Sequence, residues 1–168
     1  MTADYPTDLS IGPSYFESYQ TWPAVRFIHG FNLAKNGTNS AKSLTDSAAH
    51  ACKALSKDSF LSWEMGNEPD LYKEQGVRPK SWGEADLVKE WNIKVESVKE
   101  ALKSACGDDW AGGERFKWVA PSFAGPKNSL DAVKTWKAGL DRSSTVARFS
   151  SHKYGTLPST VCCTDTYI

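Results

Sequence analysis

Hydrophobic residues follow two patterns that alternate along the chain, one typical of strands and one typical of helices. Short apolar runs with the length and aromatic content of buried strands occur at 26–33, 60–67, 116–121 and 146–152. Apolar residues three or four positions apart, typical of helices with one packed face, recur at 40–56, 81–106 and 128–140, and a further helical turn is expected at 14–19. Ser81-Trp82-Gly83-Glu84 has the form of a capping box at a helix start, and Gly107 is typical of a helix end. Strands that alternate with helices predict an α/β fold with a parallel sheet.

The segment 60–72, FLSWEMGNEPDLY, is the most informative part of the chain. Its apolar run leads into Gly66 and then into Asn67-Glu68-Pro69. Glycine weakens a strand and proline cannot donate a ladder hydrogen bond, so we expect the strand to end here and the third strand to end at Pro121. The end of a buried strand is also where barrel enzymes hold catalytic side chains, which makes this carboxylate beside an amide a candidate.

Every predicted strand ends in polar residues. They are Asn32, then Asn67 and Glu68, then Ser122, and finally His152 and Tyr154. Because the carboxyl ends of parallel strands meet at one edge of a sheet, the loops after them can build a single site. The sequence therefore predicts one site to which all of these strands contribute.

Glu68 is the natural general acid of such a site. A carboxyl group among aromatic residues is partly desolvated, which helps it to hold a proton near neutral pH, and Asn67 beside it can donate to a hydroxyl group. Equally, Glu68 fits a surface carboxylate that caps the next turn, and His152 fits either a site residue or a polar strand end. Glu64 lies four residues earlier, on the same side but deeper, and is expected to be a structural interior acid.

Composition restricts the class of protein. The 168 residues suffice for one domain, and 20 basic residues balance 20 acidic ones, so nothing indicates a nucleic acid or an anionic membrane as partner. No apolar run has the length of a membrane span and no signal peptide is visible. Neither a glycine-rich nucleotide motif nor a metal-ligand spacing is present, so we expect no cofactor and no metal. Most of the seven tryptophans are expected in the core, although such rings also stack on sugars.

The four cysteines leave the redox compartment open. Cys52 and Cys106 each lie near the end of a predicted helix and are either bridged or free, while Cys162 and Cys163 are adjacent. Asn36-Gly37-Thr38 is an N-glycosylation sequon, which is usable only if the chain is secreted.

Several motifs, in this order, resemble glycoside hydrolase family 79, the β-glucuronidase and heparanase-like group. They are IGPSYFESY, FIHGFNLAKNG, WEMGNEPDLYK, VAPSFAGP and FSSHKY, and they extend from about residue 10 to residue 154. The resemblance implies part of a TIM (β/α)8 barrel, approximately strands three to six with their helices, in residues 1–154. The tail 155–168 does not resemble the family and is expected to be irregular.

The resemblance also implies roles for particular residues. Glu68 matches the acid/base of a retaining hydrolase that acts on β-linked glucuronic acid, and Asn67 matches the residue that binds the sugar's 2-hydroxyl. His152 and Tyr154 match the HxY motif near the substrate pocket, with Lys153 where the family usually has Asn. Asn32, at the end of the first strand, is added as a substrate contact. The partner is a carbohydrate, no cofactor is implied, and the family is usually secreted or lysosomal.

One departure from the family affects the expected activity. Its nucleophile is a Glu after strand seven, whereas only fourteen residues follow Tyr154 here and their sole acid is Asp165. Retaining hydrolysis needs two carboxylates about 5–5.5 Å apart. We therefore expect this chain alone to be inactive and, with barrel strands missing, to be marginally stable or to self-associate. The alternatives are an inactive carbohydrate-binding remnant and a truncated gene product.

Overall fold

The structure is a computed structural model that describes residues 10–56, 58–125 and 128–152. In this part of the chain the helices are α1 (Pro13–Glu17), α2 (Thr38–Ala54), α3 (Glu84–Cys106) and α4 (Ala132–Lys137). The strands are β1 (Phe27–Phe31), β2 (Phe60–Met65), β3 (Trp118–Phe123) and β4 (Val146–Ser151). Short 3₁₀ helices are η1 (Ser18–Gln20), η2 (Pro69–Leu71), η3 (Asp108–Trp110) and η4 (Gly113–Arg115). Tyr154, Cys162, Cys163 and the predicted tail lie outside the described residues.

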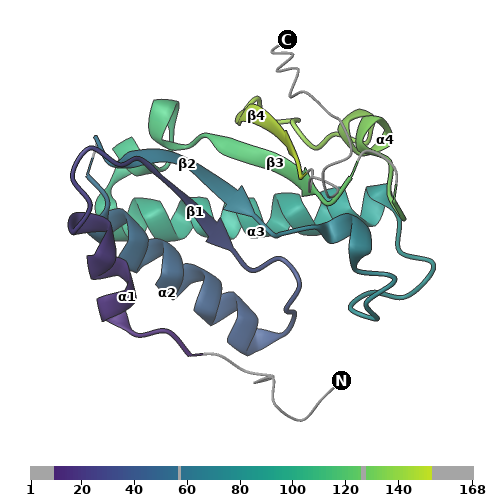
Figure 1. Ribbon diagram of the computed structural model, residues 1–168, viewed down its shortest axis with the longest axis horizontal. Coiled ribbons are helices and arrows are strands. Elements are labelled where there is room, and N and C mark those ends of the chain that lie inside the picture. Colours follow the sequence, from purple (N-terminus) through teal and green to yellow (C-terminus); the bar gives the residue numbers. More distant parts are fainter. Residues whose placement is uncertain (1–9, 57, 126–127, 153–168) are drawn as a thin grey trace, which may run out of the picture.

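The four strands form one parallel sheet in the order β1-β2-β3-β4 (Figure 1). Neighbours in the sheet are thus also neighbours along the chain, and each pair is joined by a crossover that contains a helix: α2, α3 and α4 in turn. The predicted α/β fold with a parallel sheet is confirmed.

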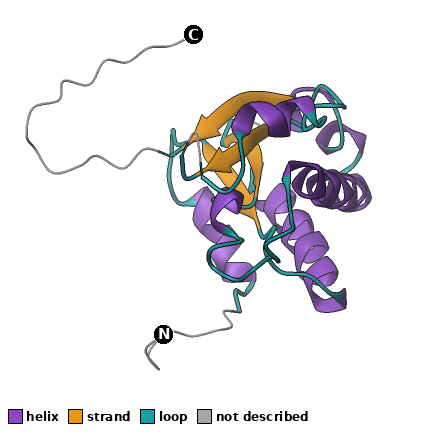
Figure 2. Cartoon of the chain, turned by 90° about the vertical axis from the view of Figure 1, so that its right-hand side faces the viewer, coloured by secondary structure: helices purple, strands orange, loops and turns teal. Residues whose placement is uncertain are grey.

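The crossover helices lie together, because α2 packs against α3 and α3 against α4. They cover one face of the sheet (Figure 2), and the core lies between these two layers. Trp63 of β2, Trp91 of α3 and Trp118 of β3 are at most 1% exposed, and the rings of Trp91 and Trp118 meet edge to face at 5.6 Å. Most of the tryptophans are therefore core residues, as expected.

The N-cap of the longest helix, α3, lies two residues after the predicted cap Ser81. This N-cap is Gly83, whose backbone N–H donates to Asp86 Oδ2 at 2.9 Å. The predicted box from Ser81 to Glu84 is therefore wrong: glycine offers no capping side chain, and only the return contact from the third helical residue is made. Gly107 ends the helix at φ 90°, as predicted. Neither α3 nor any other described helix is long and apolar enough to cross a membrane.

Strand β3 does not end at Pro121, contrary to the prediction. It continues to Phe123 with a cis Ala120–Pro121 peptide, and its pairing with β4 shifts register between Pro121 and Phe123. Past the proline, the backbone N–H of Ser122 donates to the side-chain oxygen of Ser150 at 3.0 Å. With this irregular pairing the strand continues beyond Pro121, and Ser122 lies at the edge of the sheet where the site is found.

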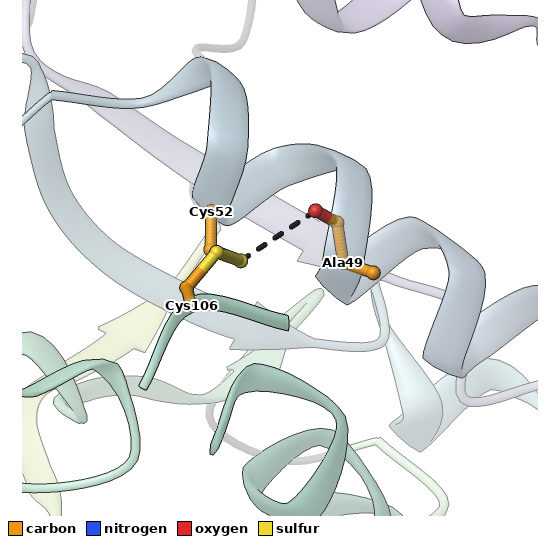
Figure 3. The surroundings of a disulfide bond; sticks show 3 residues. All are labelled: Ala49, Cys52 and Cys106. Carbon is orange, nitrogen blue, oxygen red and sulfur yellow. Dashed lines mark hydrogen bonds between the residues drawn. A yellow bond between two sulfur atoms is a disulfide. The ribbon is translucent and has the colours of Figure 1, made fainter. Parts of the chain in front are cut away.

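A disulfide joins Cys52, near the end of α2, to Cys106, the last residue of α3 (Figure 3). It closes a loop of 54 residues that contains β2. The dashed line in Figure 3 joins Cys52 Sγ to the Ala49 carbonyl oxygen at 3.5 Å; because a bridged sulfur carries no hydrogen, this is a packing contact. Of the two states left open by the sequence, the structure has the bridged one.

Candidate active site

The backbone after β2 turns sharply and brings Glu68 to the carboxyl edge of the sheet. Gly66 has φ 82°, and a Cβ built there would lie 2.6 Å from Leu33 Cβ, so only glycine fits where the segments after β1 and β2 approach each other. Glu68 itself is left-handed (φ 51°, ψ 49°) and precedes η2, which starts at Pro69. A non-glycine residue in this region is uncommon and is often found at functional sites.

Glu68 meets His152 across the sheet. The distance from Glu68 Oε1 to His152 Nδ1 is 2.8 Å, and the two side chains are 17% and 29% exposed. His152 follows β4 and is held by its own backbone N–H, which donates to the Phe123 carbonyl at 2.7 Å. The structure thus brings together two predicted site residues that lie 84 positions apart in sequence. The pair is well suited to proton transfer, because an ionised Glu68 accepts from Nδ1–H and a protonated Glu68 donates to a neutral ring.

Ser122 connects Glu68 to Glu64. Its carbonyl accepts the backbone N–H of Glu68 at 2.8 Å, and its hydroxyl donates to Glu64 Oε1 at 2.5 Å. The Ser150 hydroxyl lies 2.9 Å from Ser122 Oγ, so Ser150 donates to Ser122 when Ser122 donates to Glu64. Glu64 is half-buried below this network, in agreement with its expected structural role. Ser122 is itself left-handed, with φ 54°.

Asp70 secures the turn that carries Glu68. It is fully buried, and its carboxylate accepts from the Ala124 backbone N–H at 2.9 Å and from Asn128 Nδ2 at 2.6 Å. The Ser129 hydroxyl donates to the Asp70 carbonyl. The turn after β2 is therefore tied to the segment after β3, which limits the movement of Glu68.

The other predicted substrate contacts are Asn67, Asn32 and Tyr154. Asn67 is exposed next to Glu68, where it is open to a ligand. Asn32 follows β1, but its Oδ1 accepts the backbone N–H of Lys35 at 3.0 Å, so the side chain stabilises its own turn. Tyr154 lies outside the described residues.

Sequence reasoning missed Asp70 and the part played by Ser122 and Ser150. Asp70 directly follows Asn67-Glu68-Pro69, and an acid after a proline turn is an ordinary surface pattern, so nothing signalled its burial. Ser122 was expected at this edge, but not as the residue that links the two glutamates. In the part of the chain that the structure describes, no group of three or more His, Cys, Asp or Glu side chains is arranged to hold a metal ion.

Comparisons with known proteins indicate what the chain is similar to. No protein-family model matches the chain. The chain is 48% identical over 157 residues to a protein named β-glucuronidase from Aspergillus niger and 43% identical over 158 residues to one of the same name from Neurospora crassa. These alignments cover 92% and 91% of this chain but only 28% of each relative. The resemblance to β-glucuronidases is confirmed by these names, and the chain is thus a homologue of fungal β-glucuronidases that spans little more than a quarter of their length.

Proposed function

We propose that this chain is the middle of the catalytic barrel of a retaining β-glucuronidase of glycoside hydrolase family 79, with Glu68 as its general acid/base. The observation that carries the proposal is the position of Glu68 at the carboxyl edge of a parallel sheet, in contact with His152 from two strands away. The names of the relatives supply the reaction, and the geometry supplies a group that can perform its proton transfers.

The sheet topology supports a barrel. A doubly wound sheet reverses its strand order and places helices on both faces, whereas a (β/α)8 barrel adds each strand beside the last and keeps its helices outside. The order β1-β2-β3-β4, with α2 against α3 and α3 against α4, fits four consecutive barrel strands and the three helices between them. By the resemblance, these are strands three to six of a domain that includes residues 1–154, and 155–168 lies outside it.

In the proposed reaction, the Glu68 carboxyl protonates the glycosidic oxygen as the bond to a β-linked glucuronic acid breaks. Its carboxylate then takes a proton from the water that releases the sugar. The His152 ring fixes the Glu68 side chain, while Asn67, His152 and Tyr154 contact the substrate. The nucleophilic carboxylate is expected from a part of the longer relatives that this chain does not span, so the chain alone does not turn over. No cofactor takes part, and the protein acts outside the cell.

A chimera tests the acid/base assignment. Residues 10–152 replace the corresponding segment of the Aspergillus niger relative, and release of glucuronic acid is measured with one good and one poor leaving group. Glu68→Gln should lower turnover by about 10²–10⁴-fold, and more strongly for the poor leaving group, which needs the proton. Glu74→Gln changes an exposed acid a few residues away and should leave turnover unchanged.

One outcome would contradict the role of Glu68, and a second would contradict the statement that the chain alone does not turn over. The first is a folded chimera whose turnover is insensitive to Glu68→Gln. The second is detectable turnover by the 168-residue chain alone that Glu68→Gln removes. Binding of a glucuronide by the chain together with an inactive, correctly folded chimera would instead favour the carbohydrate-binding remnant.

A further inference from the structure

We propose that Asn36 carries an N-linked glycan and that the chain folds in an oxidising secretory compartment. The ligand class is an oligosaccharide attached through N-acetylglucosamine to the Asn36 amide nitrogen. This proposal concerns a site separate from Glu68; it shares the extracellular location with the proposed function but does not depend on the proposed catalytic reaction.

The sequon lies where a glycan can be accommodated. Asn36-Gly37-Thr38 is the sole Asn-X-Ser/Thr sequence among the 168 residues, and it connects β1 to the start of α2. Lys35, Asn36 and Gly37 are all exposed. A Cβ built on Gly37 would meet nothing within 4 Å, so the space beside the acceptor is open.

An independent observation indicates the compartment. Disulfides persist in oxidising environments and are rare in the cytosol. The bridge from Cys52 to Cys106 ties the far end of α2, the helix that begins at the sequon, to the end of α3. N-glycosylation takes place in the same secretory compartment in which such bridges form. The sequon and the disulfide therefore point to the same location.

The native contacts of Asn36 leave room for the modification. Arg78 and Lys94 hold the backbone of this loop: Arg78 Nη1 donates to the Ala34 carbonyl at 2.8 Å, and Lys94 Nζ donates to the Leu33 carbonyl at 2.7 Å. With the Asn36 amide turned so that donors face acceptors, its Oδ1 accepts from Arg78 Nη2 and its Nδ2 donates to the Lys35 carbonyl, both at 3.2 Å.

A glycosylated amide retains its oxygen as an acceptor and one N–H as a donor, which is what these two contacts require. The sugar replaces the second hydrogen of Nδ2. In the transfer, Nδ2 forms a bond to the anomeric carbon of an oligosaccharide carried on a lipid diphosphate. The bond from that carbon to the diphosphate oxygen breaks, the lipid diphosphate leaves, and Nδ2 loses one proton.

The test is expression of the full chain behind a secretory leader in a fungal host, with secreted and retained protein analysed together. The peptide that contains Asn36 is examined by mass spectrometry after an endoglycosidase that leaves one N-acetylhexosamine on the asparagine. That remnant distinguishes the glycan from deamidation, to which an Asn-Gly sequence is prone. Non-reducing peptide mapping of the same sample reports the Cys52–Cys106 bridge.

A matched set of variants makes the result specific. The wild type and Thr38→Ser keep a sequon and should carry the remnant on Asn36, whereas Thr38→Ala and Asn36→Gln should lose it entirely. The proposal is overturned if the wild-type chain forms the Cys52–Cys106 bridge while Asn36 stays unmodified. It is equally overturned if protein that has entered the secretory pathway shows neither the bridge nor the glycan, whether it is secreted or retained.

Discussion

His29 is a titratable side chain that lies almost wholly inside the protein. It is 3% exposed, and its ring nitrogens lie 2.7 Å from the Tyr19 hydroxyl and 3.0 Å from the Ser47 hydroxyl. Burial lowers the pKa of His29 from 6.5 to about 4. A neutral imidazole satisfies both hydroxyl groups, because each of them can either donate or accept.

The pH dependence of stability follows from this depressed pKa. The unfolded chain binds a proton on His29 below about pH 6.5, whereas the folded chain binds it only near pH 4. The contribution of His29 to the free energy of unfolding is therefore fully present above about pH 6.5 and is reduced by about 3 kcal/mol as the pH drops to 4. Urea unfolding at pH 7 and at pH 4.5 measures the loss. His29→Gln should be less stable at pH 7 but should lose much less between the two values, and an unchanged pH dependence in this variant would refute the assignment.

Ser122 should affect the site through Glu68. Ser122→Ala removes the hydroxyl that donates to Glu64 Oε1 and accepts from Ser150. Leaving a half-buried carboxylate without this donor should cost about 1–3 kcal/mol of unfolding free energy. In the chimera, turnover should fall about tenfold with little change in KM, because a small displacement of Glu68 weakens proton transfer more than binding. Ser97→Ala is the control, because Ser97 is only half-buried and its hydroxyl donates within α3, to the Ile93 carbonyl; it should change both quantities much less than Ser122→Ala.

Individual residues show which features of the site could be predicted from the sequence. The position of Glu68 at a strand end was predictable, because glycine and proline mark where the strand stops. Its contact with His152 was not, since it depends on the relative placement of two segments 84 residues apart. That Asn32 contacts substrate stays a prediction; the hydrogen bond from the Lys35 N–H to its Oδ1 is a local contact that the residue type alone does not predict.

At the scale of elements, the bridge between α2 and α3 fixes the two longest helices to each other. In the chain-entropy model, closing a loop of 54 residues stabilises a protein by about 4 kcal/mol. The double variant Cys52→Ala/Cys106→Ala should therefore melt at a markedly lower temperature than the oxidised wild type. Adding a reductant should lower the melting temperature of the wild type alone, and an effect of similar size on the variant would contradict this account.

Some elements are determined by the local sequence, whereas the bounds of others depend on contacts with distant segments. The apolar stripe of α3 identified that helix because its periodicity is a property of the sequence. The continuation of β3 past Pro121 escaped prediction because it depends on β4: the shifted register and the Ser150 hydroxyl accommodate a residue that lacks an N–H. Similarly, α4 spans only Ala132–Lys137 rather than 128–140, because the residues before it are engaged with Asp70 and the Asp131 side chain caps the Lys134 N–H.

For the molecule as a whole, the sequence predicted a parallel sheet but not which apolar residues remain exposed. A groove of about 440 Å³ lies between α4 and β4, lined by Val133, Trp136 and Phe149 among others. These side chains are 62%, 43% and 55% exposed. They follow the same apolar pattern as core residues, and only the packing shows that no described residue covers them.

This surface leads to a prediction for the 168-residue chain in isolation. Within the described residues, β1 and β4 are the sheet's outer strands, and unpaired parallel edges beside exposed apolar side chains favour association. We expect the purified chain to form dimers or larger species that grow with concentration in sedimentation velocity. Val133→Lys combined with Phe149→Lys should shift these species toward monomer, because the two charges repel across the groove between copies, whereas Ile93→Lys, on the exposed side of α3, should not. A wild-type monomer at all concentrations, with a sharp cooperative melt, would mean that the three βα units and β4 are a self-sufficient fold and that the groove contributes nothing to assembly.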